Sequence, residues 1–304
     1  MRIDTLTYSN VQTQGARQRA WLREHSPQHL QHSAALILQA LFQRSPSASP
    51  STLILGAGAC TEVPLEELAR HSDEVVLADF DLASMQQARS ELASPVLRRH
   101  IRLLEGDISG GISASLHRLI TQQPWDTLIP QGARAVFDAA AACLEQCPVP
   151  DPPRIDDLGA DEFGLIASSL VLSQLFSYPL LDILDHIQRL APALVGEQER
   201  HHRYQEAAQS FRVRVIQSHL HLLRELVDTG GLIALLSDIR GFAFNTMGTD
   251  HKHRRAIPLV PRVFSDLVRE NFTVLEESHW EWITNLPEKD KFGRGYEVVG
   301  YLLM

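Results

Sequence analysis

Short apolar runs separated by segments with helical spacing define the middle of the chain. Each run is short enough to be a buried strand of a parallel sheet. Helical patterns at about 63–70 and 83–92 separate the first three runs. The runs lie at 52–55, 74–78, 100–104 and 163–168. This alternation predicts parallel strands joined by right-handed helical crossovers, and hence a doubly wound α/β sheet.

The segments before and between these strands have mostly helical patterns. Residues 1–44 carry apolar residues at helical spacing, and the serine- and proline-rich segment 45–51 separates them from the first strand. A helix is predicted at 133–146, before a proline-rich break, and a long helical region is predicted at 180–228.

The last part of the chain is expected to complete the sheet. Strands are predicted at 232–236, 272–277 and 296–303. We expect a long loop from Arg240 to His253, and a loop holding Trp280 and Trp282 between the last two strands.

These patterns predict an organisation with one sheet and helical additions. We expect an N-terminal helical cap at 1–48 and one α/β domain at 49–304. Within that domain, helical insertions are expected at about 110–160 and 180–215.

Charge and cysteine content narrow the classes of protein. Asp and Glu number 37 against 28 Lys and Arg, a net charge of −9, which argues against a nucleic-acid partner because phosphate binding needs a concentrated basic surface. The three cysteines are too few for a disulfide framework. The start of the chain lacks the apolar core of a signal peptide, and no apolar run reaches membrane-spanning length. We therefore expect a cytoplasmic protein without a membrane partner.

A glycine turn and an acid carry the chemistry that the sequence suggests. Gly56, Ala57 and Gly58 follow the first strand, where glycines permit a sharp turn and close approach of a ligand to the backbone. Asp79 ends the second strand, 21 positions after Gly58. An acid at about that spacing reaches the ribose hydroxyls of a bound nucleoside.

The residues after the turn indicate which nucleoside would bind. A dinucleotide fingerprint has a third glycine where this chain has Thr61, because the diphosphate lies against the start of the helix. Glu62 adds a carboxylate there, which would repel a diphosphate and attract an ammonium group. The pattern therefore favours S-adenosylmethionine over NAD.

Five segments in order resemble successive motifs of the class I S-adenosylmethionine-dependent methyltransferases. They are residues 53–62, 75–89, 104–108, 163–175 and 228–238. The resemblance implies a Rossmann-like, doubly wound, mostly parallel sheet with an antiparallel last strand, an N-terminal helical lid and helical insertions. It also implies S-adenosyl-L-methionine as cofactor and S-adenosyl-L-homocysteine as product.

The resemblance further implies a role for each matching residue at the cofactor. Gly56, Ala57 and Gly58 would line the methionine end, Asp79 would bind the ribose, Phe80 would lie against the adenine, Asp107 would accept from the adenine amino group, Ile108 would pack on its ring, and Ser168 would close over the cofactor. Three positions depart from the pattern: Ile54 replaces an acid, Cys60 a glycine and Gly164 an aspartate. Glu62 would compensate for the missing acid at Ile54.

The methyl acceptor should lie beside the later strands. Methyl transfer from a sulfonium is a direct displacement, so alignment matters most and a base is needed only if the acceptor must lose a proton. His251 is the candidate base, although a solvated loop histidine is the commoner case. The candidate acceptor-binding residues are Tyr8, Trp21, Gln174, Tyr178, His279 and Trp282.

Four functions remain open from the sequence. The first is a methyltransferase for a small-molecule acceptor, through oxygen or nitrogen, since helical additions would enclose a pocket. The alternatives are a protein or peptide methyltransferase, an NAD-dependent oxidoreductase and a non-catalytic nucleoside-binding domain. No metal site is expected, because histidines two apart, such as His219 and His221, point to different faces of a helix. The helical region at 197–228 could form a homodimer face.

Overall fold

The computed structural model describes residues 21–244, 255–287 and 292–304, which divide into two compact units. The sheet unit comprises Met1–Ile108, Ile155–Ser173 and Leu223–Met304 within the described ranges. The helical unit comprises Ser109–Arg154 and Gln174–Leu222.

The described part of the sheet unit contains one eight-stranded sheet. Its strands are β1 (Thr52–Leu55), β2 (Val75–Asp79), β3 (Ile101–Glu105), β4 (Phe163–Ser169), β5 (Val227–Phe244), β6 (Arg255–Pro258), β7 (Val274–Asn285) and β8 (Gly293–Leu303). The order is β3-β2-β1-β4-β5-β8-β7, with β6 on β5. Strands β1 to β5 are parallel, and β8 is antiparallel to both β5 and β7. The predicted mostly parallel sheet with an antiparallel last strand is therefore confirmed.

Strand order reverses between β1 and β4, and this decides where a ligand can bind. In open α/β sheets the crevice at such a switch point, outside the carboxyl ends of the strands, is the usual ligand site. The register aligns Leu55 at the end of β1 with Ser168 of β4, and Ser168 with Leu235 of β5. The segments that follow β1, β4 and β5 therefore meet at one edge of the sheet.

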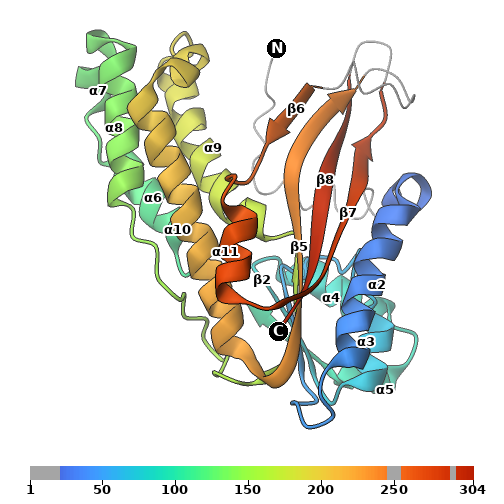
Figure 1. The fold of residues 1–304 in the computed structure, drawn as a ribbon. Helices are drawn as coiled ribbons and strands as arrows, with labels where there is room; N and C mark the ends of the chain where they lie inside the picture. Colours follow the sequence, from blue (N-terminus) through green and yellow to red (C-terminus); the bar gives the residue numbers. More distant parts are fainter. Residues whose placement is uncertain (1–20, 245–254, 288–291) are drawn as a thin grey trace. The chain divides into compact units, whose positions relative to one another are not determined.

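Helices cover the sheet on the face that carries Ile54, Leu77 and Ala167. In Figure 1, α2 runs beside β7 and β8, with α3 next to it. The helices of the sheet unit are α2 (Pro27–Gln43), α3 (Leu65–His71), α4 (Leu82–Glu91), α5 (Pro95–Arg99) and α11 (Phe264–Asn271). Helix α2 buries Leu36 and Ile37 against this face, and each such side chain contributes about 1.5–3 kcal/mol through removal from water.

Gly164 stands where the methyltransferase motif has an aspartate, because the backbone of Ser49 crosses this position. A Cβ at this position would lie 2.0 Å from the carbonyl oxygen of Ser49. The amide of Gly164 donates to the carbonyl of Ser51, so the segment before β1 passes directly over the start of β4. An aspartate side chain has no room at this position.

The helical unit is built from amphipathic helices. They are α6 (Ile112–Thr121), α7 (Trp125–Leu128), the 3-10 turn η1 (Ile129–Gln131), α8 (Ala133–Gln146), α9 (Leu172–Leu190), η2 (Val195–Arg200) and α10 (His202–Leu226). The ends of α9 and α10 continue into the sheet unit. Arg214 of α10 donates to the carbonyls of Leu144 (2.7 Å) and Cys147 (3.0 Å), and so binds the carboxyl end of α8.

His219 gives the helical unit a dependence on pH. It lies in α10 with 1% of its surface exposed, and burial lowers its pKa to about 4. In the unfolded chain the pKa of this histidine is near its ordinary value of 6.5. Below that pH the unfolded chain therefore binds a proton that the folded chain does not bind. Stability should therefore be complete above pH ~6.5 and should fall by up to about 3 kcal/mol as the pH drops towards ~4.

Urea unfolding at several pH values checks this expectation. The variant His219→Gln should lose this part of the pH dependence. His221→Gln, two positions later and partly exposed beside Asp151, is the matched control and should retain it. Parallel pH profiles for wild type and His219→Gln would contradict the assignment.

Two predicted loops are wrong. Trp280 and Trp282 lie within β7, whose ladder with β8 extends to Asn285. Residues from Arg240 to Phe244 belong to β5, which pairs with both β6 and β8. In each case the hydrogen bonds of a neighbouring strand extend the element beyond its apolar run.

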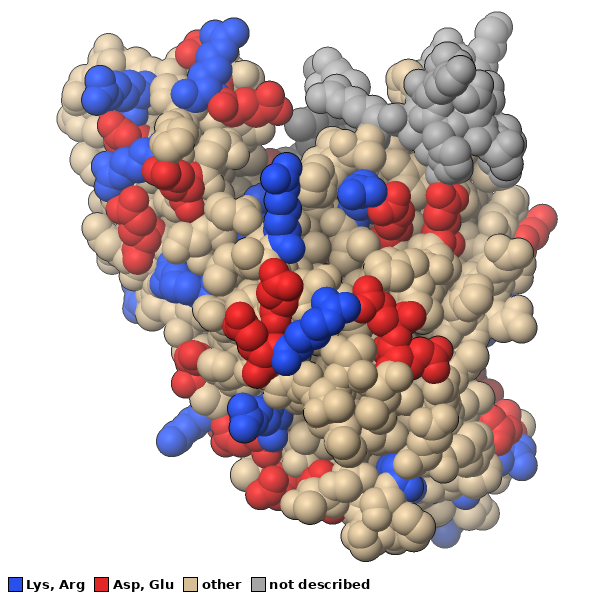
Figure 2. Space-filling view, in the orientation of Figure 1, with Lys and Arg blue, Asp and Glu red and all other residues tan. Residues whose placement is uncertain are grey.

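On the face seen in Figure 2, basic and acidic side chains are interspersed among the described residues. Ion pairs such as Arg240 with Glu297 and Arg269 with Glu277 follow the same pattern. Within the described ranges, no helix combines the length and the apolar character needed to cross a membrane.

Candidate functional site

The turn after β1 has a left-handed backbone at three positions. The φ angles are 71° at Gly56, 44° at Gly58 and 51° at Cys60. The amides of Gly56 and Ala57 both donate to the carbonyl of Ala78, which fixes the turn to the end of β2. Cys60 stands where the related motif has a glycine, and its left-handed φ explains that preference, because only glycine adopts this conformation without strain.

The two glycines of the turn meet different surroundings. A Cβ at Gly56 would lie 2.5 Å from Cβ of Val171, which follows β4. A Cβ at Gly58 would meet only Oδ2 of Asp79 within 4 Å, at 3.9 Å. Gly56 therefore permits close packing between the ends of β1 and β4, whereas Gly58 leaves an open cradle beside Asp79.

Asp79 is held with both carboxylate oxygens in place. Oδ2 accepts from the amide of Gly58 and Oδ1 from the amide of Asp81, each at 2.9 Å. Burial raises the pKa of Asp79, and the amide hydrogen bonds oppose that shift by favouring the charged form. The amide of Phe80 is a third donor to this carboxylate. A carboxylate has about four lone-pair sites, so Asp79 can still accept from a hydroxyl group of a ligand.

The segments around Asp79 present an aromatic ring and a second acid. Phe80 keeps 40% of its surface exposed directly after Asp79. The amide of Gly106 donates to the carbonyl of Asp79 at 3.1 Å and brings the loop after β3 alongside. In that loop Asp107 is exposed and Ile108 is buried. Helix α4 starts beside this group, capped by Asp81 through the amide of Ser84.

This edge of the sheet suits a nucleoside with a cationic tail better than a dinucleotide. The carboxylate of Asp79, the ring of Phe80 and the open cradle at Gly58 match a ribose, a base and a chain that passes close to the backbone. Glu66 and Glu67 occupy the first turn of α3, and Glu62 precedes it. Glu66 and Glu67 pair with Arg70 on the same helix, so Glu62 is the carboxylate that opposes an anionic diphosphate here. The residues present therefore fit S-adenosylmethionine.

Ser168 lies within strand β4, further from the carboxyl edge of the sheet than the residues of the glycine turn. It is in register with Leu55 and has no exposed surface. After it the chain turns through Leu170, whose φ is 53°, so that Val171 meets Gly56. The part of the β4 segment that lies nearest the glycine turn is therefore Val171.

The predicted acceptor residues within the described ranges lie on different elements of the two units. Trp282 stacks on His29 with ring centroids 4.6 Å apart, whereas His279 points to the opposite face of β7 and pairs with Glu277. Trp21 is partly buried and stacks on a neighbouring histidine. Gln174 and Tyr178 are exposed on α9, within the helical unit. Tyr8 and His251 lie outside the described residues.

Several polar residues at this edge were missed by the sequence analysis. Asp238 follows the apolar run of β5 and has 8% of its surface exposed. Its carboxyl group accepts a hydrogen bond from the hydroxyl of Ser173. His29 and Ser33 are fully buried on α2. Only Asp238, directly after the apolar run of β5, gave a sequence signal, because His29 and Ser33 lie in a helix whose partners are distant in the chain.

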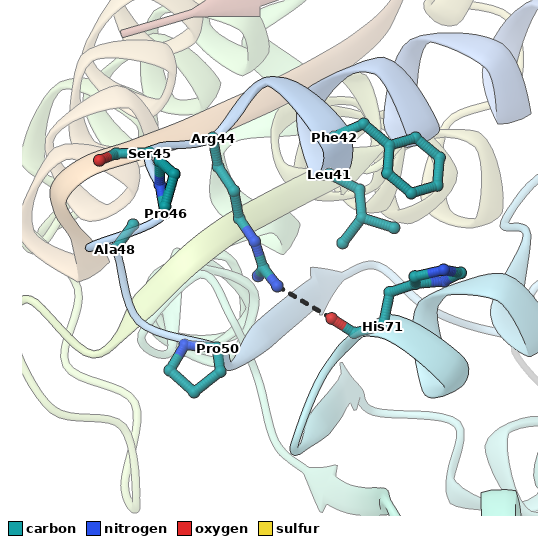
Figure 3. Close-up of a pocket in the computed structure, with 8 residues that line it drawn as sticks. All are labelled: Leu41, Phe42, Arg44, Ser45, Pro46, Ala48, Pro50 and His71. Atoms are coloured by element: carbon teal, nitrogen blue, oxygen red, sulfur yellow. Dashed lines mark hydrogen bonds between the residues drawn. The ribbon is translucent and has the colours of Figure 1, made fainter.

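A surface depression elsewhere in the sheet unit is not this site. It has a volume of about 310 Å³ and is lined by Leu41, Arg44, Pro50 and His71, among others. Figure 3 shows Arg44 pointing across it to the carbonyl of His71, to which it donates at 2.9 Å. Pro50 precedes β1, so the depression lies at the amino ends of the strands, opposite to the usual ligand edge.

Metal ligands do not gather at this edge. Within the described ranges, no group of three or more His, Cys, Asp or Glu side chains is arranged to hold a metal ion.

No family model matches the sequence, and no curated protein does. Among solved structures, the chain is similar to the glycopeptide N-methyltransferase MtfA in complex with S-adenosylmethionine, at 12% identity and a TM-score of 0.38, over 90% of this chain and 93% of that one. It is also similar to an S-adenosylmethionine-dependent methyltransferase from Leishmania major, at 10% identity and 0.38, over 90% and 73%. A third, from Aquifex aeolicus, gives 10% and 0.35, over 88% and 87%. At such values these likenesses carry no argument about activity, which has to rest on the residues of this chain.

Proposed function

We propose that this protein is an S-adenosylmethionine-dependent methyltransferase that acts on a small-molecule acceptor, at oxygen or nitrogen, by direct displacement. The observation that carries the proposal is the carboxylate of Asp79, which is held by the amides of Gly58, Asp81 and Phe80 and keeps an acceptor site for a ligand hydroxyl group. It stands at the switch-point edge of the sheet, beside a glycine cradle.

The roles of the residues follow from their places at this edge. Asp79 would hold the two ribose hydroxyls, Phe80 would lie against the base, and Asp107 and Ile108 would complete its pocket. Gly58 would let the amino-acid end pass the backbone, and Glu62 would attract its ammonium group. The cofactor, when bound, supplies an activated methyl group, and this chain contributes orientation and proximity.

A small-molecule acceptor and a cytoplasmic setting belong to the same proposal. None of the three cysteines, all of which lie in the described ranges, forms a disulfide bond. Burial raises the pKa of Cys143 and Cys147 to about 11, so both are protonated at neutral pH. Cysteines without disulfide bonds support a reducing compartment. The assignment of residues 1–48 to a cap, and of two helical insertions to the remaining domain, stays a prediction.

Calorimetry with three ligands tests the proposal. S-Adenosylmethionine and S-adenosylhomocysteine should each bind at one site per chain, and NAD should not bind. Binding of NAD alone would show an oxidoreductase-type site, and binding of none of the three would contradict the proposal.

A further inference from the structure

Buried polar atoms without a hydrogen-bond partner gather at one place in the sheet unit. Among its described residues they are His29 Nε2, Ser33 Oγ, Trp282 Nε1 and Asp238 Oδ1. Folded proteins satisfy about nine in ten buried polar groups, so four such atoms on neighbouring elements need an explanation.

These side chains form one cluster on the sheet face covered by α2. Asp238 pairs with Val298, which pairs with Trp280, and Tyr296 pairs with Trp282 in the next row on the same face. Trp282 lies between two rings, with centroids 4.6 Å from His29 and 5.3 Å from Tyr296. Ser33 follows His29 by one helical turn, so it lies on the same side of α2.

The cluster offers hydrogen-bond donors at one end. Nε1 of Trp280 donates to Nδ1 of His29 at 2.9 Å, so the proton of the imidazole is on Nε2. Nε2 lies 3.9 Å from Glu62, which is too far for a hydrogen bond. The imidazole N–H, the indole N–H of Trp282 and the hydroxyl of Ser33 are therefore free to donate to a ligand.

The other end of the cluster is a carboxyl group without a cation. The carboxyl group of Asp238 receives hydrogen bonds from Ser173 and from its own backbone amide. Its Oδ1 has no partner among the described residues. Burial raises its pKa, and the negative field of Asp238 helps to raise that of Tyr296. Arg240, two positions later, is engaged by Glu297 at 2.9 Å. A buried carboxylate of this kind needs a cationic or donating partner.

The cluster lies on the far side of the glycine turn from Asp79. Val171 touches Gly56, and Ser173, two residues later, bonds Asp238. Strand β5 is two strands away from β1, a separation of about 10 Å. A group bound at Asp238 would therefore lie beyond the nucleoside, at the methyl-bearing end.

We propose that this cluster binds the methyl acceptor, and that the acceptor is an amine with a carboxylate or carbonyl group nearby, as in an amino acid or a short peptide. The inference rests on the proposed methyltransferase function. The amine would face Asp238 beside the ring of Tyr296, where an aromatic face favours a cation. The oxygen atoms of the acceptor would take hydrogen bonds from His29, Ser33 and Trp282.

Asp238 would act as the base in methyl transfer to the amine. The Asp238 carboxylate takes one proton from the bound ammonium, which leaves a neutral amine with a lone pair. The nitrogen forms a bond to the methyl carbon as the carbon–sulfur bond breaks, and that electron pair goes to sulfur. The product leaves as a methylated ammonium ion, and Asp238 returns its proton to solvent.

The first experiment asks whether the cluster belongs to the cofactor or to the acceptor. Binding of S-adenosylhomocysteine and of 5′-methylthioadenosine, which lacks the amino-acid end, is measured for wild type, Asp238→Asn and Trp282→Phe. We expect both affinities to stay within about twofold of wild type, which also shows that the variants fold. A loss of affinity for S-adenosylhomocysteine but not for methylthioadenosine would place the cofactor's own amino-acid end in the cluster and overturn the inference.

The second experiment measures transfer of labelled methyl groups to a panel of probes. The panel holds α-amino acids and dipeptides, with matched carboxylic acids and alcohols that lack the amine. We expect methylation of amine-bearing members only, with kcat/KM reduced about 100-fold in Asp238→Asn and about tenfold in Trp282→Phe. Asp266→Asn, an exposed acid on α11, is the matched control and should keep wild-type activity.

The outcomes separate the two proposals. Wild type that fails to bind S-adenosylhomocysteine overturns the methyltransferase function, and the acceptor inference with it. Wild type that binds this ligand but methylates alcohols, acids or no member of the panel overturns the acceptor inference alone. Wild-type turnover in Asp238→Asn does the same.

Discussion

Replacing Asp79 by alanine will weaken binding of S-adenosylhomocysteine by at least about tenfold. A hydrogen bond to a charged group is worth about 1.5–3 kcal/mol, and the carboxylate keeps at least one acceptor site for a ribose hydroxyl group. A loss of about 1.5 kcal/mol or more corresponds to that factor in affinity. The amides of Gly58 and Asp81 would also lose their acceptor, so the turn would be less well ordered for the ligand. Calorimetry measures the change.

Two further variants give this prediction its controls. Asp79→Asn keeps one acceptor oxygen and should lose less affinity than Asp79→Ala. Glu105→Gln removes an exposed acid that is in register with Asp79 on β3, and its affinity should stay within about twofold of wild type. Wild-type affinity in Asp79→Ala would show that the ribose assignment is wrong.

Replacing Gly56 by alanine should destabilise the protein by about 2–5 kcal/mol. The φ of 71° costs an alanine about 1–2 kcal/mol, because Cβ approaches the following carbonyl. The contact of 2.5 Å with Cβ of Val171 adds the cost of an overpacked core, about 1–3 kcal/mol. Denaturant unfolding measures the free-energy change.

The second glycine of the turn provides the matched comparison. Gly58→Ala has the same left-handed strain but an open neighbourhood, so its stability should fall by only about 1–2 kcal/mol while affinity for S-adenosylhomocysteine drops. Adding Val171→Gly to Gly56→Ala removes the contacting Cβ, so the double variant should lose less stability than the sum of the two single losses. Equal losses of stability in the two single variants would argue against the contact with Val171.

The predicted cofactor residues came from signals that are local in the chain. A glycine turn after an apolar run, and an acid about 20 positions later, reflect the geometry of one βαβ unit, which parallel pairing of β1 and β2 imposes. The same kind of parallel pairing, between β2 and β3, brings the Gly106–Asp107 loop beside Asp79 and Phe80. Their spacing in the sequence therefore reflects their closeness in space. The alternation of Trp280 and Trp282 with exposed neighbours was also a local strand signal, although the sequence analysis placed both in a loop.

The acceptor side depends on contacts between distant segments. His29 receives its hydrogen bond from Trp280, 251 positions later, and Asp238 receives its own from Ser173. No periodicity within a helix or strand indicates such a pairing. It arises only when β4, β5 and β7 join one sheet and α2 packs against that sheet. The departure at Gly164 has the same origin, since its cause is the backbone of Ser49.

The sequence by itself determined the doubly wound sheet, the glycine turn and the acid at its carboxyl edge, because hydrophobic period and strand spacing are encoded within short stretches of chain. The tertiary structure alone decided which polar atoms are left buried without partners beside that edge. Burial and hydrogen-bond satisfaction depend on every neighbour in space, so they exist only once the chain has folded.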